Sequence, residues 1–218
     1  PNIVPYLDMP LQHGSDAVLR RMKRPVLAKS RQSIEVIRAA IPDVVLRTTF
    51  IVGFPGETEA DFGEMLDFVR EQRFDHLGAF TYSPQVGTPA ETMGEQVPEP
   101  VKQERYGRLM ELAQEISLAS NRTMVGRELD VLVESREPSR SAGGDPIVVG
   151  RTMRDAPEVD GLALLKGTYP AGTMVRAVVR GALPYDLLCD PVEALAPAST
   201  VRAARPSRGA GDARIRRR

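Results

Sequence analysis

The alternation of apolar runs with amphipathic helical patterns constrains the fold of this chain more than any other feature of the sequence. Three apolar runs predict strands at residues 3–8, 45–54 and 76–83. The second half of the middle run is almost continuously apolar, which is typical of a strand covered on both faces. Connections of this length join parallel strands through right-handed crossovers. We therefore expect an α/β fold that begins with a partial parallel (βα) barrel of three βα units, in residues 1–125.

Helical patterns fill the intervals between these strands. They begin at Ser15, at Ser30 or Ser33, at Thr58 and near Glu99; the second ends at Pro42 and the last near Asn121. The clearest start is Thr58, which is followed three residues later by Asp61 and so resembles a capping box. Three βα units are half of a closed barrel, so two strand edges and one core face are expected to lack cover.

Beyond Gly126 the pattern changes to short alternating strands separated by turns such as Gly143-Gly144-Asp145. The runs ELDVLVE, IVVGRTM, GLALLKG and MVRAVVRG are expected to form a small all-β barrel, because closure removes exposed strand edges. The chain is thus divided into residues 1–125, residues 126–196 and a tail, 197–218, that is expected to be disordered. From Ala198 onward the tail has seven Arg and one acid. A solvated extension is the simpler interpretation, and contact with RNA phosphates is the alternative.

The chain of 218 residues has one cysteine, Cys189. Disulfides, thiolate zinc sites and iron–sulfur clusters each need at least two thiolates, so no metal is expected to be held by this chain alone. The same count indicates a reducing compartment. No run approaches the roughly 18 apolar residues of a membrane span, and the first residues do not resemble a signal peptide. A cytoplasmic protein without a membrane partner is therefore expected.

A polar or glycine-rich cluster follows each predicted strand. The clusters are Gln12, His13 and Ser15; Gly53-Phe54-Pro55-Gly56-Glu57; and Tyr82 with Ser83. In a parallel barrel the carboxyl ends of the strands form the active-site rim, so the three clusters predict one shared pocket. The glycine-rich turn lies at a helix N-terminus, which favours an anionic group.

Simpler explanations exist for the same residues. Ser15 is more often only a helix N-cap, and Glu57 can act only on the helix dipole. His76 is more often a solvent-facing histidine than a ligand. His13 is better placed for a function, but two histidines in the chain cannot form a zinc site without carboxylates. No Ser-His-Asp arrangement is evident, so no catalytic residue is assigned.

Three stretches resemble the second half of the radical S-adenosylmethionine (SAM) domain of the methylthiotransferase family. They are PYLDMPLQHGSDAVLRRMKRP (residues 5–25), RTTFIVGFPGETEADF (47–62) and FDHLGAFTYSPQVGTPA (74–90). The β module resembles the TRAM domain that follows in that family. His13, residues 22–25, residues 47–49 and residues 155–161 are similar to members that add a methylthio group to the β-carbon of an aspartate in small-subunit ribosomal protein 12. Members that act on tRNA tend to have serine in place of His13 and aspartate in place of the threonine within residues 47–49.

The resemblance implies SAM and two four-iron four-sulfur clusters in the full-length enzyme, one to cleave SAM to a radical and one to supply sulfur. It also implies a set of SAM-binding residues: Gly53, Phe54, Pro55 and Glu57 beside the adenine and methionine portions, and Gln12, Ser15 and Arg47 near the ribose or carboxylate. The three-cysteine motif and the N-terminal cluster-binding domain are absent here and would lie before Pro1. The missing N-terminal half of the same enzyme is therefore an expected partner, and the chain alone is expected to be inactive and to bind no cluster.

The charge of the β module bears on its partner. Residues 127–190 contain eight basic and ten acidic residues, and a mildly acidic module suits a basic ribosomal protein better than RNA. Two other interpretations stay open: a tRNA methylthiotransferase, and a non-catalytic fragment that docks on the ribosome.

Overall fold

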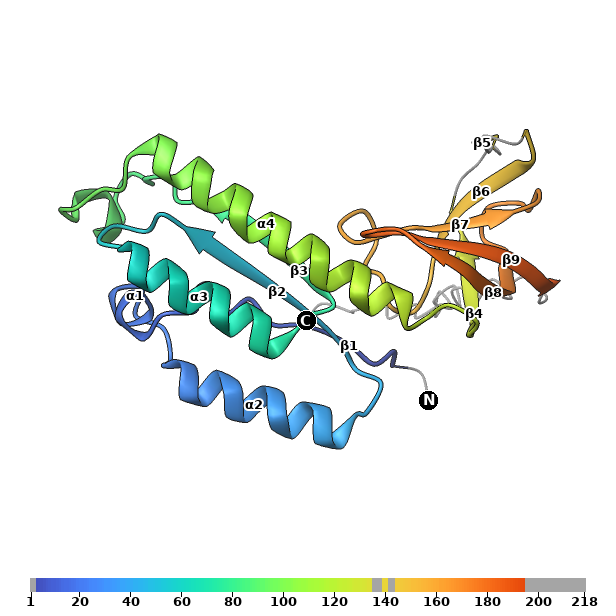
Figure 1. Ribbon diagram of the computed structural model, residues 1–218, viewed down its shortest axis with the longest axis horizontal. Helices are drawn as coiled ribbons and strands as arrows, with labels where there is room; N and C mark the ends of the chain where they lie inside the picture. Colours follow the sequence, from blue (N-terminus) through green and yellow to red (C-terminus); the bar gives the residue numbers. More distant parts are fainter. Residues whose placement is uncertain (1–2, 135–138, 141–143, 195–218) are drawn as a thin grey trace, which may run out of the picture.

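The structure is a computed structural model that describes residues 3–134, 139–140 and 144–194. It consists of a three-stranded sheet with its helices and a small β-barrel, and the long helix α4 runs from the first part to the second (Figure 1). The expected α/β class, with a partial parallel barrel followed by a β-barrel, is confirmed. Within the described residues, no helix has the length and apolar character needed to cross a membrane. The predicted tail, 197–218, lies outside the described residues.

The first part follows the predicted order of strands and helices. Its elements are β1 (Tyr6–Asp8), α1 (Asp16–Arg21), α2 (Leu27–Ala40), β2 (Val45–Val52), α3 (Glu59–Gln72), β3 (His76–Thr81), the 3-10 helix η1 (Pro89–Thr92) and α4 (Glu99–Arg122). The strands lie in the order β1-β2-β3 and both pairings are parallel. The carboxyl ends of all three strands therefore lie at one edge of the sheet.

Only one face of this sheet is fully buried. Phe50 on β2 packs edge-to-face on Phe68 and Phe74, within the core shared with the helices. The opposite face is open: Ile51 is only partly buried, and Phe80 on β3 is 64% exposed. The expectation of cover on both faces of β2 is therefore wrong for the described residues, and the expected open core face is present.

Helix α2 begins earlier than Ser30 or Ser33. The Asp16 carboxylate accepts a hydrogen bond from the backbone N–H of Leu27 at 2.7 Å, which satisfies one of the free donors at the helix start. This cap comes from 11 residues away, so local sequence gave no sign of it. At α3, the capping box of Thr58 and Asp61 is confirmed.

The second part is a closed barrel. Its elements are β4 (Glu128–Val133), β5 (Ser139–Arg140), β6 (Pro146–Arg151), β7 (Ala163–Lys166), β8 (Met174–Ala182) and β9 (Leu187–Ala194). The strands β4-β8-β9-β7-β6 form a ring that closes through a β4–β6 pairing, and β5 adds to β6. Strand β9 was not predicted, because it contains Pro191 and pairs with β8 through register shifts. Helix α4 ends at Arg122 and β4 begins at Glu128.

The loop between β6 and β7 joins the barrel to the amino-terminal edge of the sheet. Asp160 accepts hydrogen bonds from the Tyr6 hydroxyl at 2.5 Å and from Arg47 Nε at 3.2 Å. His76 Nε2 hydrogen-bonds the carbonyl of Arg154 at 2.8 Å, and its side chain is 10% exposed. The interpretation of His76 as solvent-facing is therefore wrong. The barrel docks at the end of the sheet opposite to the predicted rim.

Candidate functional site

The predicted rim exists at the carboxyl ends of the three strands. Gln12 follows β1 and forms a parallel bridge with Phe50, with Gln12 N–H to Thr49 O at 2.9 Å. The Gly53–Glu57 turn follows β2, and Tyr82 follows β3. The Phe54 and Tyr82 rings lie 5.3 Å apart in a T-shaped contact, so the second and third clusters pack directly on one another.

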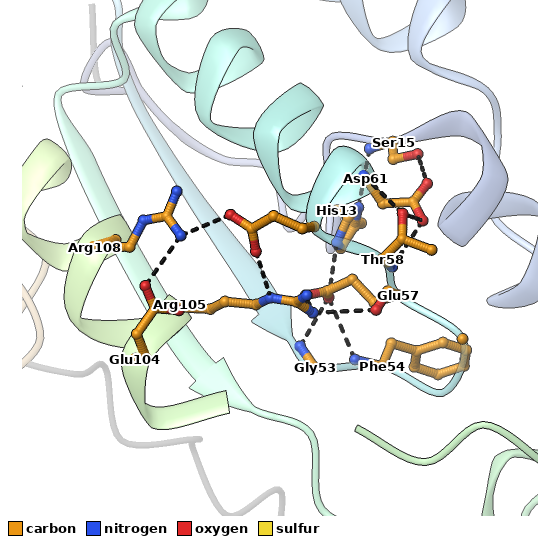
Figure 2. Close-up of polar contacts among 12 residues, drawn as sticks. His13, Ser15, Gly53, Phe54, Glu57, Thr58, Asp61, Glu104, Arg105 and Arg108 are labelled. Atoms are coloured by element: carbon orange, nitrogen blue, oxygen red, sulfur yellow. Dashed lines mark hydrogen bonds and ion pairs between the residues drawn. The ribbon is translucent and has the colours of Figure 1, made fainter. Parts of the chain in front are cut away.

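Glu57 is the centre of a buried polar network beneath the turn (Figure 2). Its Oε2 accepts hydrogen bonds from the backbone N–H of Gly53 at 2.8 Å and lies 3.1 Å from His13 Nε2. Its Oε1 accepts from Arg105 Nη1 at 2.8 Å. The carboxylate is thus used in holding the turn, and its side chain has no exposed surface. Glu57 therefore holds the conformation of the turn from its buried side.

The hydrogen bonds of His13 define its tautomer. The backbone N–H of Ser15 donates to His13 Nδ1 at 2.9 Å, so Nδ1 must carry a lone pair. The proton of the neutral ring then sits on Nε2 and points to the Glu57 carboxylate. His13 is completely buried, so it is placed to orient Glu57 and cannot touch a ligand in the rim.

Ser15 occupies the N-cap position of α1, but its hydroxyl makes no cap hydrogen bond there. It donates instead to Asp61 Oδ1 at 2.7 Å, while Thr58 Oγ1 donates to Asp61 Oδ2. Burial acts to raise the pKa of Asp61, but these hydrogen bonds outweigh it and hold the pKa below its ordinary value. Ser15 therefore ties the start of α1 to the start of α3.

Gly53 is required by both its conformation and its neighbour. Its φ is +73°, and a Cβ there would lie 2.3 Å from Cγ of Lys102 on α4. Lys102 is itself buried and donates to the Tyr82 carbonyl at 2.9 Å. Pro55 is also buried within the turn, and Gly56 N–H donates to the Glu95 carbonyl at 2.9 Å.

A cavity of about 280 Å³ opens at this rim. Gln12 and Phe54 line it together with Ile51 and Met93. The ring of Tyr82 contacts Phe54, and its hydroxyl is buried and has no hydrogen-bond partner among the described residues. Such an orphaned polar atom is uncommon in a folded core; because Tyr82 does not line the cavity, its hydroxyl is not a contact for a ligand there.

Arg47 does not reach this rim. It lies near the amino end of β2, six residues before Gly53, and a strand covers about 20 Å in that length. Its guanidinium binds Asp8 at 2.9 Å and Asp160 at 3.2 Å. The structure therefore brings together Gln12, Gly53, Phe54, Pro55 and Glu57, connects Ser15 to them through His13, and separates Arg47 from them all.

Two buried cations of this site, Lys102 and Arg105, were not predicted. Both come from α4, where they continue the buried stripe of Leu109, Leu112 and Ile116 towards the helix start. Basic residues on the apolar face of a helix are a signal that sequence can show, because buried charges are normally paired. The partner of Arg105, Glu57, lies 48 residues away.

The groups that the family resemblance implies differ in how well the described residues suit them. The cavity, its apolar lining and the Gln12 amide suit a nucleoside-type ligand such as SAM. A metal cluster does not fit: the described part of the chain has no group of three His, Cys, Asp or Glu side chains that could hold a metal ion. Cys189 is buried in the β-barrel core.

Comparison with known proteins finds two matched domains and several similar proteins. Residues 2–69 match the radical SAM superfamily and residues 125–192 match the TRAM domain. The chain is similar to proteins named ribosomal protein uS12 methylthiotransferase RimO from Moorella thermoacetica (52% identity over 80% of this chain) and from a Synechococcus strain (48% over 86%). It covers 38% and 39% of these relatives, so it spans about two fifths of their length. With both domains in this order and identity at this level, the chain corresponds to a C-terminal part of these RimO proteins, with a radical SAM region followed by a TRAM domain.

Proposed function

We propose that this chain is the C-terminal part of an enzyme that adds a methylthio group to ribosomal protein uS12, on the β-carbon of an aspartate. The observation that carries the proposal is the rim cavity: Gln12 and the Gly53–Glu57 turn, which the family resemblance implies at the cofactor, meet there at the ends of parallel strands. The identity to proteins named for this activity supports the same substrate. A cytoplasmic location is part of the proposal.

The residues of this chain would bind and orient SAM. Phe54 and Ile51 offer apolar surface for the adenine, Gln12 offers an amide for the ribose, and Glu57 fixes the turn from below. SAM, together with two four-iron four-sulfur clusters, would supply the radical, sulfur and methyl chemistry. The cluster ligands are proposed to lie in the N-terminal half of the enzyme, which completes the barrel on the open face of the sheet.

The surface of the β-barrel favours a protein over tRNA as substrate. Several of its basic side chains are paired with acids: Arg151 with Glu134, Arg176 with Asp130, and both Lys166 and Arg180 with Asp190. Paired cations are less available for phosphates, on which RNA affinity depends. This observation supports the ribosomal protein against the tRNA alternative.

The test is to supply the complete enzyme with SAM, reductant and uS12, and to measure the mass of uS12 and of bulk tRNA. We expect uS12 alone to gain one methylthio group. The variant Gly53→Ala should lose SAM binding and activity, because its Cβ would collide with Lys102; Gly63→Ala, on α3 with open space around its Cβ, is the matched control. Modification of tRNA, or of neither substrate, would contradict the proposal.

A further inference from the structure

Three basic residues line the mouth of the rim cavity, and two of them, Lys23 and Arg24, have no acidic partner within the described residues. Arg21, Lys23 and Arg24 all line the cavity, and its lining includes no acid. Arg21 donates to the Gly56 carbonyl at 2.7 Å. Lys23 and Arg24 are exposed, and within the described residues neither side chain forms an ion pair or a hydrogen bond. Some other exposed cations are paired, such as Arg31 with Glu71 and Arg108 with Glu59, whereas Lys29 and Arg73, like Lys23 and Arg24, form no ion pair within the described residues.

The backbone holds Lys23 in an unfavourable conformation at this position. The N–H of Arg24 donates to Leu19 O at 2.8 Å and that of Lys23 to Arg20 O at 3.1 Å, which closes the end of α1 as in a Schellman motif. Lys23 takes the left-handed position of that motif, with φ +55°, where glycine is strongly favoured. Gln12, on the same cavity, also has a positive φ, of +75°. Non-glycine residues with positive φ are concentrated at functional sites in proteins generally; in this structure Arg73, Glu95 and Glu158 also have positive φ and do not line the cavity.

We propose that Lys23 and Arg24 bind the carboxylate of the aspartate-type side chain that the protein substrate presents to this cavity. The inference rests on the proposed function and names the contact by which the site selects its target residue. Two adjacent cations suit a carboxylate, which Arg can bind through two parallel hydrogen bonds. An asparagine side chain has the same size but no charge, so the two cations would bind it more weakly than an aspartate.

The position of the two cations favours the substrate over the cofactor as the source of this carboxylate. Lys23 and Arg24 are exposed at the mouth, whereas Phe54 is buried and Gln12 and Ile51 are partly buried. A side chain presented by a second macromolecule reaches the mouth first. The carboxylate of SAM itself has the same chemistry, so the experiment must separate the two sources.

The experiment measures three dissociation constants on the complete enzyme. The ligands are a peptide of the target segment of uS12 with its aspartate, the same peptide with asparagine, and SAM. The variants are Lys23→Met and Arg24→Gln, with Lys23→Arg and Arg24→Lys as charge-preserving partners. Lys29→Met is the matched control, because Lys29 is an exposed lysine on α2 that does not line the cavity.

We expect Lys23→Met and Arg24→Gln each to weaken binding of the aspartate peptide by about tenfold, the effect of losing one charged hydrogen bond. Binding of the asparagine peptide and of SAM should stay within about twofold, and the charge-preserving variants should recover most of the loss. Equal loss for both peptides, no loss, or a tenfold loss of SAM affinity would each overturn the assignment while leaving the proposed function standing. If the unaltered enzyme binds neither peptide, the proposed function itself fails and this inference falls with it.

Discussion

The buried ion pair of Arg105 and Glu57 is expected to contribute measurably to the free energy of unfolding. Arg105 is 5% exposed and neutralises the fully buried carboxylate of Glu57. Removing one partner of a buried ion pair leaves an uncompensated charge, which typically costs about 3–5 kcal/mol. We therefore expect Arg105→Met to lower the free energy of unfolding by about that amount in urea titrations.

Arg108, one turn further along α4, provides the comparison. It pairs with Glu59 and Glu104 at a position where its side chain is 41% exposed, and such pairs contribute at most about 1 kcal/mol. Arg108→Met should therefore be nearly neutral. Equal losses in the two variants would show that the Glu57 network contributes no more than a surface contact does.

The buried thiol of Cys189 is expected to make the free energy of unfolding depend on pH in the alkaline range. Burial raises the pKa of its thiol to about 11, and the nearby charges of Asp190 and Asp155 act in the same direction. Below about pH 9 the thiol is protonated in both the folded and the unfolded chain, so it has no effect on stability. Between about pH 9 and 11 the unfolded chain releases the proton first, so stability falls by roughly 1–3 kcal/mol.

The measurement is the free energy of unfolding of the unaltered chain and of Cys189→Ala between pH 8 and pH 11. The difference between the two should change with pH in favour of the variant, since alanine has no proton to lose. A constant difference over this range would show that the folded thiol titrates normally.

Among the helices and strands, α3 has the start at which hydrogen bonds from two helices meet. Thr58 Oγ1 accepts from the Asp61 N–H at 3.1 Å, and Asp61 in turn accepts from Thr58 and from Ser15 of the neighbouring helix. Thr58→Ala should cost about 1–2 kcal/mol, the usual effect of losing an N-cap, as measured by thermal unfolding. Thr92→Ala, an exposed residue of η1 with a long hydrogen bond of 3.3 Å, should cost less than about 0.5 kcal/mol.

The same elements show what sequence could and could not predict. The parallel pairing of β1, β2 and β3 followed from the alternation of strands and helices and the length of the connections. The Thr58 capping box followed from residue spacing, because it depends on neighbours within a few positions. The start of α2 depended on Asp16, and strand β9 was hidden by Pro191. Its position in the ring depends on pairing with β8 and β7, which no local pattern encodes.

The direction in which each side chain of the site points could not be predicted from the sequence. The spacing of the clusters predicted one rim, and Gln12 and Phe54 do line one cavity there. Arg47 belonged to a motif that resembles the family, but its position near the amino end of β2 places it beside Asp160 of the other part of the molecule. Glu57 faces inward because its partners, His13 and Arg105, come from distant positions in the chain. The roles of the predicted residues at a cofactor stay predictions.

For the whole molecule, Asp160 is one of the polar links between the sheet and the barrel, beside Arg154 with Asp75. The Asp160 side chain is 2% exposed and accepts hydrogen bonds from Tyr6, Arg47 and the N–H of Ala156. Burial and the hydrogen bond to Asp160 raise the pKa of the Tyr6 hydroxyl, and the positive charge of Arg47 acts in the opposite direction. Losing this carboxylate leaves Arg47 with Asp8 alone and loosens the docking of the loop on β1 and β2.

We expect Asp160→Ala to increase amide hydrogen exchange at least tenfold in residues 154–161 and in β1, because several buried hydrogen bonds close this junction. Exchange in β8 and β9 should be unchanged, since those strands are held by the barrel core. Asp190→Ala is the control: its carboxylate joins Lys166 and Arg180 within the barrel, so its effect should stay on β7 and β8. If Asp160→Ala instead raised exchange evenly through the barrel, Asp160 would be a residue of barrel stability and the junction would be held by the apolar contacts around it.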